Sequence, residues 1–300
     1  MYEDPVVEEE KPPKPSFTGP VLEDKPVNED AANLQSTNGH AATEEVVDSP
    51  EKARQNSRLL DSGITKIKSK SLEVHGFRKF QSLLRDNKTV LADDKFETLL
   101  LGLFQYLEDP LSSTPQEKVQ DIKAQILTTI KLLLKRERDN FQPHVSKCLE
   151  SLLQTRSAYD NRAHIVSGLE LLSDELVSLG DGTEIVVVLG RRLQDCTDTT
   201  TEGCRALSMG LHILKALLDK HGQTPLSDGD LAQLVALAER CIESADSGVR
   251  MDAVQLCVAL HARIGEQHFW DSLKGVKDDP KSLITYYIVK RQREQGVEAS

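Results

Sequence analysis

Apolar residues recur through most of the chain at spacings of three and four positions, with polar residues between them. This spacing lines up apolar side chains along one face of an α-helix. The clearest runs are Val119, Ile122, Ile126, Ile130 and Leu133, then Ile165, Leu169, Leu172, Leu176 and Leu179, then Leu207, Leu211, Leu214 and Leu218. The pattern predicts helices over residues 71–87, 94–107, 115–138, 141–155, 160–179, 183–195, 201–221, 228–244, 247–264, 266–274 and 280–295.

Short helix-breaking segments separate the predicted helices, as at Gly180-Asp181-Gly182 and Asp278-Asp279-Pro280. Taken in pairs, the helices form units of about 40 residues, which is the period of HEAT-type repeats. A single helical hairpin cannot cover its own apolar face, so neighbouring hairpins must stack. The sequence therefore predicts an all-α fold, an α-solenoid of about five to six HEAT-like helical hairpins. An ordinary irregular helical domain is the alternative.

Three helix starts carry capping signals. Thr114-Pro115-Gln116-Glu117 combines a capping threonine, a first-turn proline and a reciprocal glutamate. The segment Asp246 to Ala253 has the capping acid, Val-Arg pair and small residue that commonly open the second helix of a HEAT repeat. Ser49-Pro50 predicts a short helix that ends at about Leu60.

The N-terminal segment differs from the rest of the chain. Residues 1–48 are acidic, contain many prolines and carry almost no large apolar side chains, so they cannot bury enough surface to offset their chain entropy. The expected organisation is a disordered acidic tail (1–48), a short helix and linker (49–70), a HEAT-repeat array (71–296) and a disordered end (297–300).

Charge is distributed in the same uneven way. The net charge is −11, and residues 1–50 contribute −9 of it through twelve acids and three lysines. The other 250 residues carry 36 acids and 34 bases, a net charge of −2. A near-neutral array is unlike the strongly basic domains that bind nucleic acid, so no nucleic-acid partner is expected.

Motifs for catalysis are missing from the sequence. It has no GxxxxGK loop, HExxH helix or GxSxG elbow, and no two histidines have the i, i+4 spacing of a zinc helix. Five cysteines without a CxxC pair suit a reducing compartment, although Cys196 and Cys204 flank one loop and could pair. We therefore expect no enzyme, cofactor, metal site or small-molecule substrate, and neither a secretory signal nor membrane insertion.

Three groups of residues are candidates for partner binding. A basic stretch suits an acidic surface, with a solvated helix face as the alternative. Two aromatic residues could anchor a partner, with a core role as the alternative. The last helix could dock a partner or simply cap the array. The basic stretch comprises Lys66, Lys68, Lys70, Arg78 and Lys79. The aromatic residues are Phe269 and Trp270, and the candidates on the last helix are Tyr287, Lys290 and Arg291. We also expect the turns at 86–93, 156–159, 196–200 and 245–248 to lie along one edge.

The last helix, Ser282 to Arg291, resembles the closing helix of the C-terminal domain of CLASP-family microtubule-associated proteins. Phe77 to Leu84, Phe96 to Leu100 and Asp246 to Gly265 are also similar to that domain, and the resemblance covers about residues 71–296. It implies an array of HEAT repeats of the TOG-like kind. The family stabilises microtubules at plus ends, spindles and kinetochores, and its C-terminal domain recruits partner proteins and supports self-association.

The resemblance thus implies a non-enzymatic interaction module in the cytoplasm, on the cytoskeleton and spindle, or in the nucleus. Its partners would be kinetochore or plus-end factors. Direct binding of tubulin or microtubules through residues 66–79 is one alternative. The turn Asp86 to Asp94 lacks the tryptophan that tubulin-gripping TOG domains usually place in the first helix pair. A generic HEAT scaffold, as in transport or phosphatase adaptors, is the other alternative.

Overall fold

The computed structural model describes residues 50–86, 91–158, 163–220 and 226–298. Within these ranges all regular elements are helices, which confirms the predicted all-α class. The expected acidic tail (1–48) lies outside the described residues. At the other end of the chain, the last helix continues to Glu298, two residues beyond the predicted end of the array.

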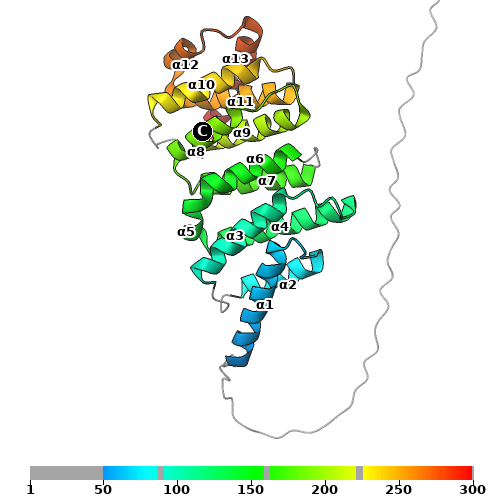
Figure 1. The fold of residues 1–300 in the computed structure, drawn as a ribbon. Helices are drawn as coiled ribbons and strands as arrows, with labels where there is room; N and C mark the ends of the chain where they lie inside the picture. The colour runs from blue at the N-terminus through cyan, green and yellow to red at the C-terminus, as the bar shows by residue number, and fades with distance from the viewer. Residues whose placement is uncertain (1–49, 87–90, 159–162, 221–225, 299–300) are drawn as a thin grey trace, which may run out of the picture. The chain divides into compact units, whose positions relative to one another are not determined.

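The helices follow one another with short connections (Figure 1). Their bounds are α1 (Pro50–Lys68), α2 (Val74–Arg85), α3 (Asp93–Glu108), α4 (Gln116–Arg136), α5 (Arg138–Phe141), the 3-10 helix η1 (Gln142–His144), α6 (Val145–Ala158), α7 (Ala163–Val177), α8 (Gly182–Gln194), α9 (Thr201–Lys220), α10 (Asp228–Ile242), α11 (Ser247–Ile264), α12 (Glu266–Ser272) and α13 (Asp278–Glu298).

Consecutive helices pack as antiparallel hairpins, and the hairpins stack (Figure 1). The described pairs are α1 with α2, α3 with α4, α6 with α7, α8 with α9, and α10 with α11. One layer of the stack runs α1, α3, α6, α8 and α10, and the other runs α2, α4, α7, α9, α11 and α13. Helix α12 also packs on α11. This arrangement is the predicted solenoid of HEAT-like hairpins.

The predicted apolar stripes form the core of the stack. On α4, Ile126, Ile130 and Leu133 are fully buried, and Val119 and Ile122 are nearly so. Burying a leucine or isoleucine side chain stabilises a fold by about 1.5–3 kcal/mol. Most contacts between helices join different hairpins, so stacking holds the array together.

Of two predicted side-chain caps at helix starts, the structure confirms one and contradicts the other. The Asp246 side chain accepts a hydrogen bond from the Val249 backbone nitrogen at 2.9 Å, which confirms the predicted cap of α11. The predicted cap at Thr114 is wrong, because Pro115 occupies the N-cap position of α4 and no side chain caps it. The Thr114 hydroxyl makes no hydrogen bond among the described residues.

Helix α1 is longer than the sequence predicted. It continues past Leu60 to Lys68, and it buries Leu60, Ile64 and Ile67 against α2 and α3. Gly63 lies at the contact with α2, where a Cβ atom would be 2.3 Å from Cδ2 of Phe80. The segment predicted as a helix and linker is therefore the first helix of the first hairpin.

This first hairpin changes the pairing of the helices that follow. The turn inside it spans residues 69–73, and the segment 86–92 instead connects the first hairpin to the second. The prediction that 86–94 is the turn of the first helix pair is wrong for this reason. Like the segment at 86–94, residues 69–73 contain no tryptophan.

A lysine is buried inside the second hairpin, between α4 and the end of α3. Lys123 on α4 is fully buried, and its Nζ donates hydrogen bonds to the carbonyl oxygens of Tyr106, Leu107 and Asp109 at the end of α3. These carbonyls have no partner within the helix, so Lys123 acts as a C-terminal cap. Burial lowers the pKa of Lys123 to about 7, against an opposing influence from Asp109.

Among the helices described, none has both the length and the apolar character that crossing a lipid bilayer requires.

Candidate partner-binding surface

The turns inside successive hairpins lie next to one another. Lys70 in the first turn forms an ion pair with Asp109 in the second. The Ser157 hydroxyl at the end of α6 donates to the Glu202 carbonyl at 3.2 Å, and the Ala245 nitrogen donates to Oδ2 of Asp198 at 3.3 Å. We call this surface the turn edge; its described members are residues 69–73, 109–115, 195–200 and 243–246.

The expected alignment of four turns is thus correct for three and wrong for one. The segments at 156–159, 196–200 and 245–248 contribute Ser157, Asp198 and Ala245 to the turn edge. The segment at 86–93 follows the far end of α2. There the guanidinium of Arg136, at the end of α4, donates to the Leu84 carbonyl at 2.9 Å, on the opposite edge.

A hollow of about 590 Å³ lies between the first two turns, and we call it the first hollow. Its ionic side chains are Lys70, Glu73, His75, Arg78, Lys118 and Asp121, and Thr114 also lines it. The hydrogen bond from Lys70 lowers the pKa of Asp109. Within the described part of the chain, Arg78 and Lys118 form no ion pair. Two cations are therefore available to an acidic partner.

Both turns beside the first hollow hold a non-glycine residue in left-handed backbone. Lys70 has φ 55° and Leu111 has φ 50°. Such a conformation costs a side-chain-bearing residue about 1–2 kcal/mol. Ordered neighbours hold it in place: Lys70 is tied to Asp109, and the Leu111 nitrogen donates to Oδ1 of the same Asp109 at 2.9 Å. The backbone beside the hollow is thus fixed by one carboxylate.

A second hollow of about 450 Å³ lies between the fourth and fifth turns. Its lining includes Arg156, Arg205, the hydroxyl groups of Thr199 to Thr201, and Asp246. Arg156 is 8% exposed, and the buried Nε of Arg205 has no hydrogen-bond partner in the described structure. This second hollow therefore combines guanidinium groups with hydroxyl donors, which suits carboxylate-bearing protein segments.

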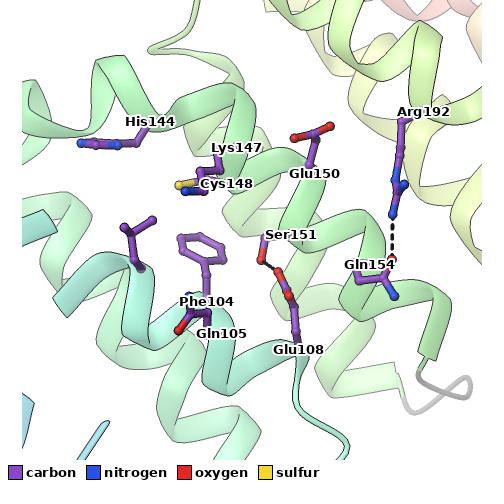
Figure 2. A pocket seen from close by; sticks show the side chains of 11 residues that line it. Phe104, Gln105, Glu108, His144, Lys147, Cys148, Glu150, Ser151, Gln154 and Arg192 are labelled. Carbon is purple, nitrogen blue, oxygen red and sulfur yellow. Dashed lines mark hydrogen bonds between the residues drawn. The ribbon is translucent and has the colours of Figure 1, made fainter. Parts of the chain in front are cut away.

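A third hollow of about 580 Å³ lies away from the turn edge, on the layer formed by α3, α6 and α8 (Figure 2). The Glu108 carboxylate accepts a hydrogen bond from the Ser151 hydroxyl, and Arg192 donates to Gln154 at 2.9 Å. Burial raises the pKa of the Cys148 thiol in its wall to about 12, so this sulfur stays protonated and is a poor nucleophile. Its mixed charges favour no single class of ligand.

No group of three or more His, Cys, Asp or Glu side chains is arranged for metal binding in the described ranges. Cys196 and Cys204 are free thiols, and each sulfur donates to a nearby backbone carbonyl, of Arg192 and of Asp198 respectively. Their pKa values are raised, first of all by burial. The possible pairing of these two cysteines is not formed in this structure.

The predicted basic stretch is divided by the fold. Lys70 and Arg78 line the first hollow. Lys66 and Lys79 line a separate, mainly apolar groove of about 340 Å³ between α1 and α2. Lys68 is exposed and lines neither. Antiparallel packing of α1 on α2 separates residues that are close in sequence, so the five cations do not form one patch.

The predicted aromatic anchor is a core residue. Phe269 is fully buried and contacts His261 and Trp270 edge-on, with ring centroids 5.4 and 5.0 Å away. It cannot touch a partner without leaving the core, so the alternative considered for Phe269 is correct. Trp270 is half-buried and packs against the same cluster.

On the last helix, α13, the predicted residues Arg291, Lys290 and Tyr287 make contacts within the array. Arg291 pairs with Asp219 of α9 at 2.8 Å, and Lys290 lies 5.9 Å from the ring centroid of the half-buried Tyr287. Ile284 and Ile288 are in the core, whereas Leu283, Tyr286 and Val289 are exposed.

Sequence reasoning missed Lys118, Arg156 and Arg205, which line the two hollows beside the turn edge. Lys118 follows a recognisable helix start, which was a usable signal. Arg156 and Arg205 belong to different hairpins, α6 and α9, and nothing local indicates that they line one hollow.

No protein-family model matches the chain. Over 296 residues it is 67% identical to the protein STU1 of Gibberella zeae, which covers 99% of this chain and 26% of that relative. It is 54% identical over 322 residues to stu-1 of Neurospora crassa, covering all of this chain and 28% of that relative. STU1 of Chaetomium globosum is 53% identical over 326 residues. The chain thus spans about a quarter of the length of these relatives.

Two solved structures have a similar fold. One, from work on microtubule plus-end tracking by XMAP215, CLIP-170 and EB1, has a TM-score of 0.58 and 16% identity over 71% of this chain and 81% of that one. The other is from crescerin, whose TOG domain array regulates microtubules in the primary cilium. Its TM-score is 0.54, with 15% identity over 80% of this chain and 89% of that one. At these identities the comparison shows the fold alone, a TOG-like array.

Proposed function

We propose that this chain, a homologue of the fungal Stu1 proteins of the CLASP family, is a non-enzymatic docking module of a microtubule-associated protein. The observation that carries the proposal is the turn edge, where a TOG-like array presents two polar hollows and two unpaired cations. The module would work on the cytoskeleton, including the spindle, by holding plus-end or kinetochore factors.

Docking would depend on shape and charge rather than on chemistry. Stacked hairpins hold the turns at fixed spacing, so one extended or helical partner segment can touch several turns at once. Acidic side chains of the partner would meet Arg78 and Lys118 in the first hollow and the guanidinium groups in the second. Exposed charge pairs contribute about 0.2–1 kcal/mol each and mainly accelerate association, so binding should weaken as salt increases.

Direct binding of tubulin is the second candidate. Both structures with a similar fold come from studies of microtubule regulators, which favours it. The first turn, Ser69 to Glu73, has no tryptophan, which weakens it. The homology to Stu1 argues against a generic transport or phosphatase scaffold.

A charge-reversal experiment tests the turn edge with the 300-residue chain. The double variant Arg78→Glu and Lys118→Glu reverses the two unpaired cations. The matched control, Arg85→Glu and Lys135→Glu, makes the same change at exposed positions at the far ends of α2 and α4. Binding would be measured by cosedimentation with microtubules at rising salt, and by mass spectrometry of proteins retained from a mitotic extract.

The expected result is that the turn-edge variant loses partners and the control keeps them. Retained kinetochore or plus-end factors without microtubule cosedimentation would support partner docking. Salt-sensitive cosedimentation of the purified chain, lost in the turn-edge variant, would support direct tubulin binding. Equal behaviour of the two variants would refute the turn edge as the docking surface.

A further inference from the structure

We propose that Thr114 is a phosphorylation site for a proline-directed serine/threonine kinase, and that its phosphate occupies the first hollow against Arg78 and Lys118. Phosphorylation would then weaken docking at the turn edge. This last consequence rests on the proposed function, whereas the phosphate site itself does not.

The sequence around Thr114 suits such a kinase. Thr114-Pro115 is one of three Ser/Thr-Pro pairs in the chain, and the other two, Ser49-Pro50 and Thr224-Pro225, include residues outside the described ranges. Ser112, Ser113, Pro115 and Gln116 are exposed. Pro115 has φ −55° and ψ 137°, an extended backbone. Thr114 itself is half-buried, in a turn closed by the hydrogen bond from its backbone nitrogen to the Leu111 carbonyl at 2.8 Å. The motif therefore lies in a surface turn whose neighbouring residues are exposed.

The Thr114 hydroxyl is free for modification. It makes no hydrogen bond in the described structure and does not cap α4, so phosphorylation breaks no existing contact. Because no side chain caps α4, the first backbone amides of that 21-residue helix also lack a side-chain acceptor. A phosphate just before a helix start is favoured by those amides and by the helix dipole.

The first hollow supplies the countercharges. Lys70, Arg78, Lys118, Glu73 and Asp121 line it, and His75 and Tyr106 are the other titratable groups. Lys70 is already engaged by Asp109, so Arg78 and Lys118 are the cations left for a new anion. Arginine binds phosphate oxygens in a bidentate manner, and Lys118 is the third residue of α4, in its first turn.

The chemical step is ordinary phosphoryl transfer. The external kinase moves the γ-phosphoryl group of a nucleoside triphosphate to Oγ1 of Thr114, the hydroxyl proton passes to the kinase's base, and a nucleoside diphosphate leaves. The product carries a charge of about −1.5 to −2 at pH 7. That charge neutralises the two cations that an acidic partner would otherwise contact. The affinity should fall about tenfold, as expected for the loss of two exposed charge contacts.

The test uses the native chain with Ser49→Ala and Thr224→Ala in the background. This chain is treated with a cyclin-dependent kinase and ATP. Mass spectrometry of the intact chain then counts the phosphates, and peptide mapping locates them. We expect one phosphate per chain, at Thr114, and none in the additional variant Thr114→Ala. Modification of the unfolded chain but not of the native one would overturn the site, as would modification only at other residues.

A ³¹P NMR titration tests the hollow independently of any partner. Two nearby cations should hold the second pKa of the phosphate below its usual value of about 6. The double variant Arg78→Gln and Lys118→Gln should restore the ordinary value, while Arg85→Gln and Lys135→Gln should not. An ordinary pKa in the phosphorylated parent would refute the proposed pairing.

Binding is then compared between phosphorylated and unmodified chains. A roughly tenfold weaker interaction, absent in Thr114→Ala treated in the same way, is the expected result. Unchanged affinity would overturn the regulatory half of the inference. If the unmodified chain binds neither microtubules nor any partner, the proposed function fails, while the mapping and the titration still decide the phosphate site.

Discussion

Replacing the buried Lys123 by methionine tests how the end of α3 is held. Methionine has a similar length but no donor, so the carbonyl oxygens of Tyr106 and Leu107 lose their hydrogen bonds in a buried site. A buried acceptor left without a partner costs about 1–3 kcal/mol, so Lys123→Met should destabilise the chain by about 2–4 kcal/mol at pH 9.5, where the folded-state amine is neutral. For a chain of this size that lowers Tm by roughly 4–16 °C.

The loss should also depend on pH. In the unfolded chain the lysine keeps its proton up to its ordinary pKa of 10.5, whereas burial lowers the folded-state pKa to about 7. Between these values the unfolded state binds more protons, so Lys123 makes stability increase with pH in this window. Because a tenfold change in proton affinity corresponds to about 1.4 kcal/mol, the difference between wild type and variant should grow by about 3 kcal/mol from pH 7 to 9.5.

Urea unfolding followed by circular dichroism at pH 6, 7, 8.5 and 9.5 would measure both quantities. Lys135→Met, at an exposed position on the same helix, is the control and should change stability by no more than about 0.5 kcal/mol. A difference that stays flat from pH 7 to 9.5 would show that the three carbonyls keep Lys123 protonated despite burial. A variant as stable as wild type at pH 9.5 would show that the end of α3 does not need this cap.

Three further outcomes follow from packing. Gly63→Ala places a methyl group on the ring of Phe80 and should destabilise the chain by about 1–3 kcal/mol in urea unfolding; an unchanged midpoint would mean that α1 is loosely docked. Phe269→Ala should cost about 3–5 kcal/mol, whereas Tyr286→Ala, at 62% exposure, should change stability by less than about 0.5 kcal/mol; calorimetry giving equal effects would contradict this contrast. Deleting residues 1–48 should leave Tm almost unchanged, and a large decrease would show that this tail is packed.

Much of the array could be predicted because its helices repeat one long apolar stripe. The stripe on α4 covers five positions, and each of them is buried. Helix α1 was cut short because only three apolar positions, Leu60, Ile64 and Ile67, mark its second half. Their burial depends on α3, about 40 residues later in the chain. A Cβ atom placed on Gly102 of α3 would lie 3.3 Å from Cγ2 of Ile67, so the two helices are in close contact there. A local pattern cannot reveal such a distant partner.

The candidate surface was less predictable for a related reason. A turn edge is formed by stacking, so its residues are close in space but distant in sequence, as with Arg156 and Arg205. The reverse also occurs, because Lys66 and Lys70 are four positions apart and line different surfaces. Charge in a sequence window therefore indicated that cations were present, but the register of the hairpins decided which of them share a hollow.

The core and the turn edge meet at the second turn. Lys123 donates to the Asp109 carbonyl, while the Asp109 carboxylate accepts hydrogen bonds from Lys70 and the Leu111 nitrogen. The same short turn continues to Thr114 and Pro115, which border the first hollow. One buried amine thus fixes the backbone of the segment that would present both the docking cations and the phosphate. Loosening that amine should disturb the geometry of the first hollow more than that of the second, whose lining residues belong to the third, fourth and fifth hairpins.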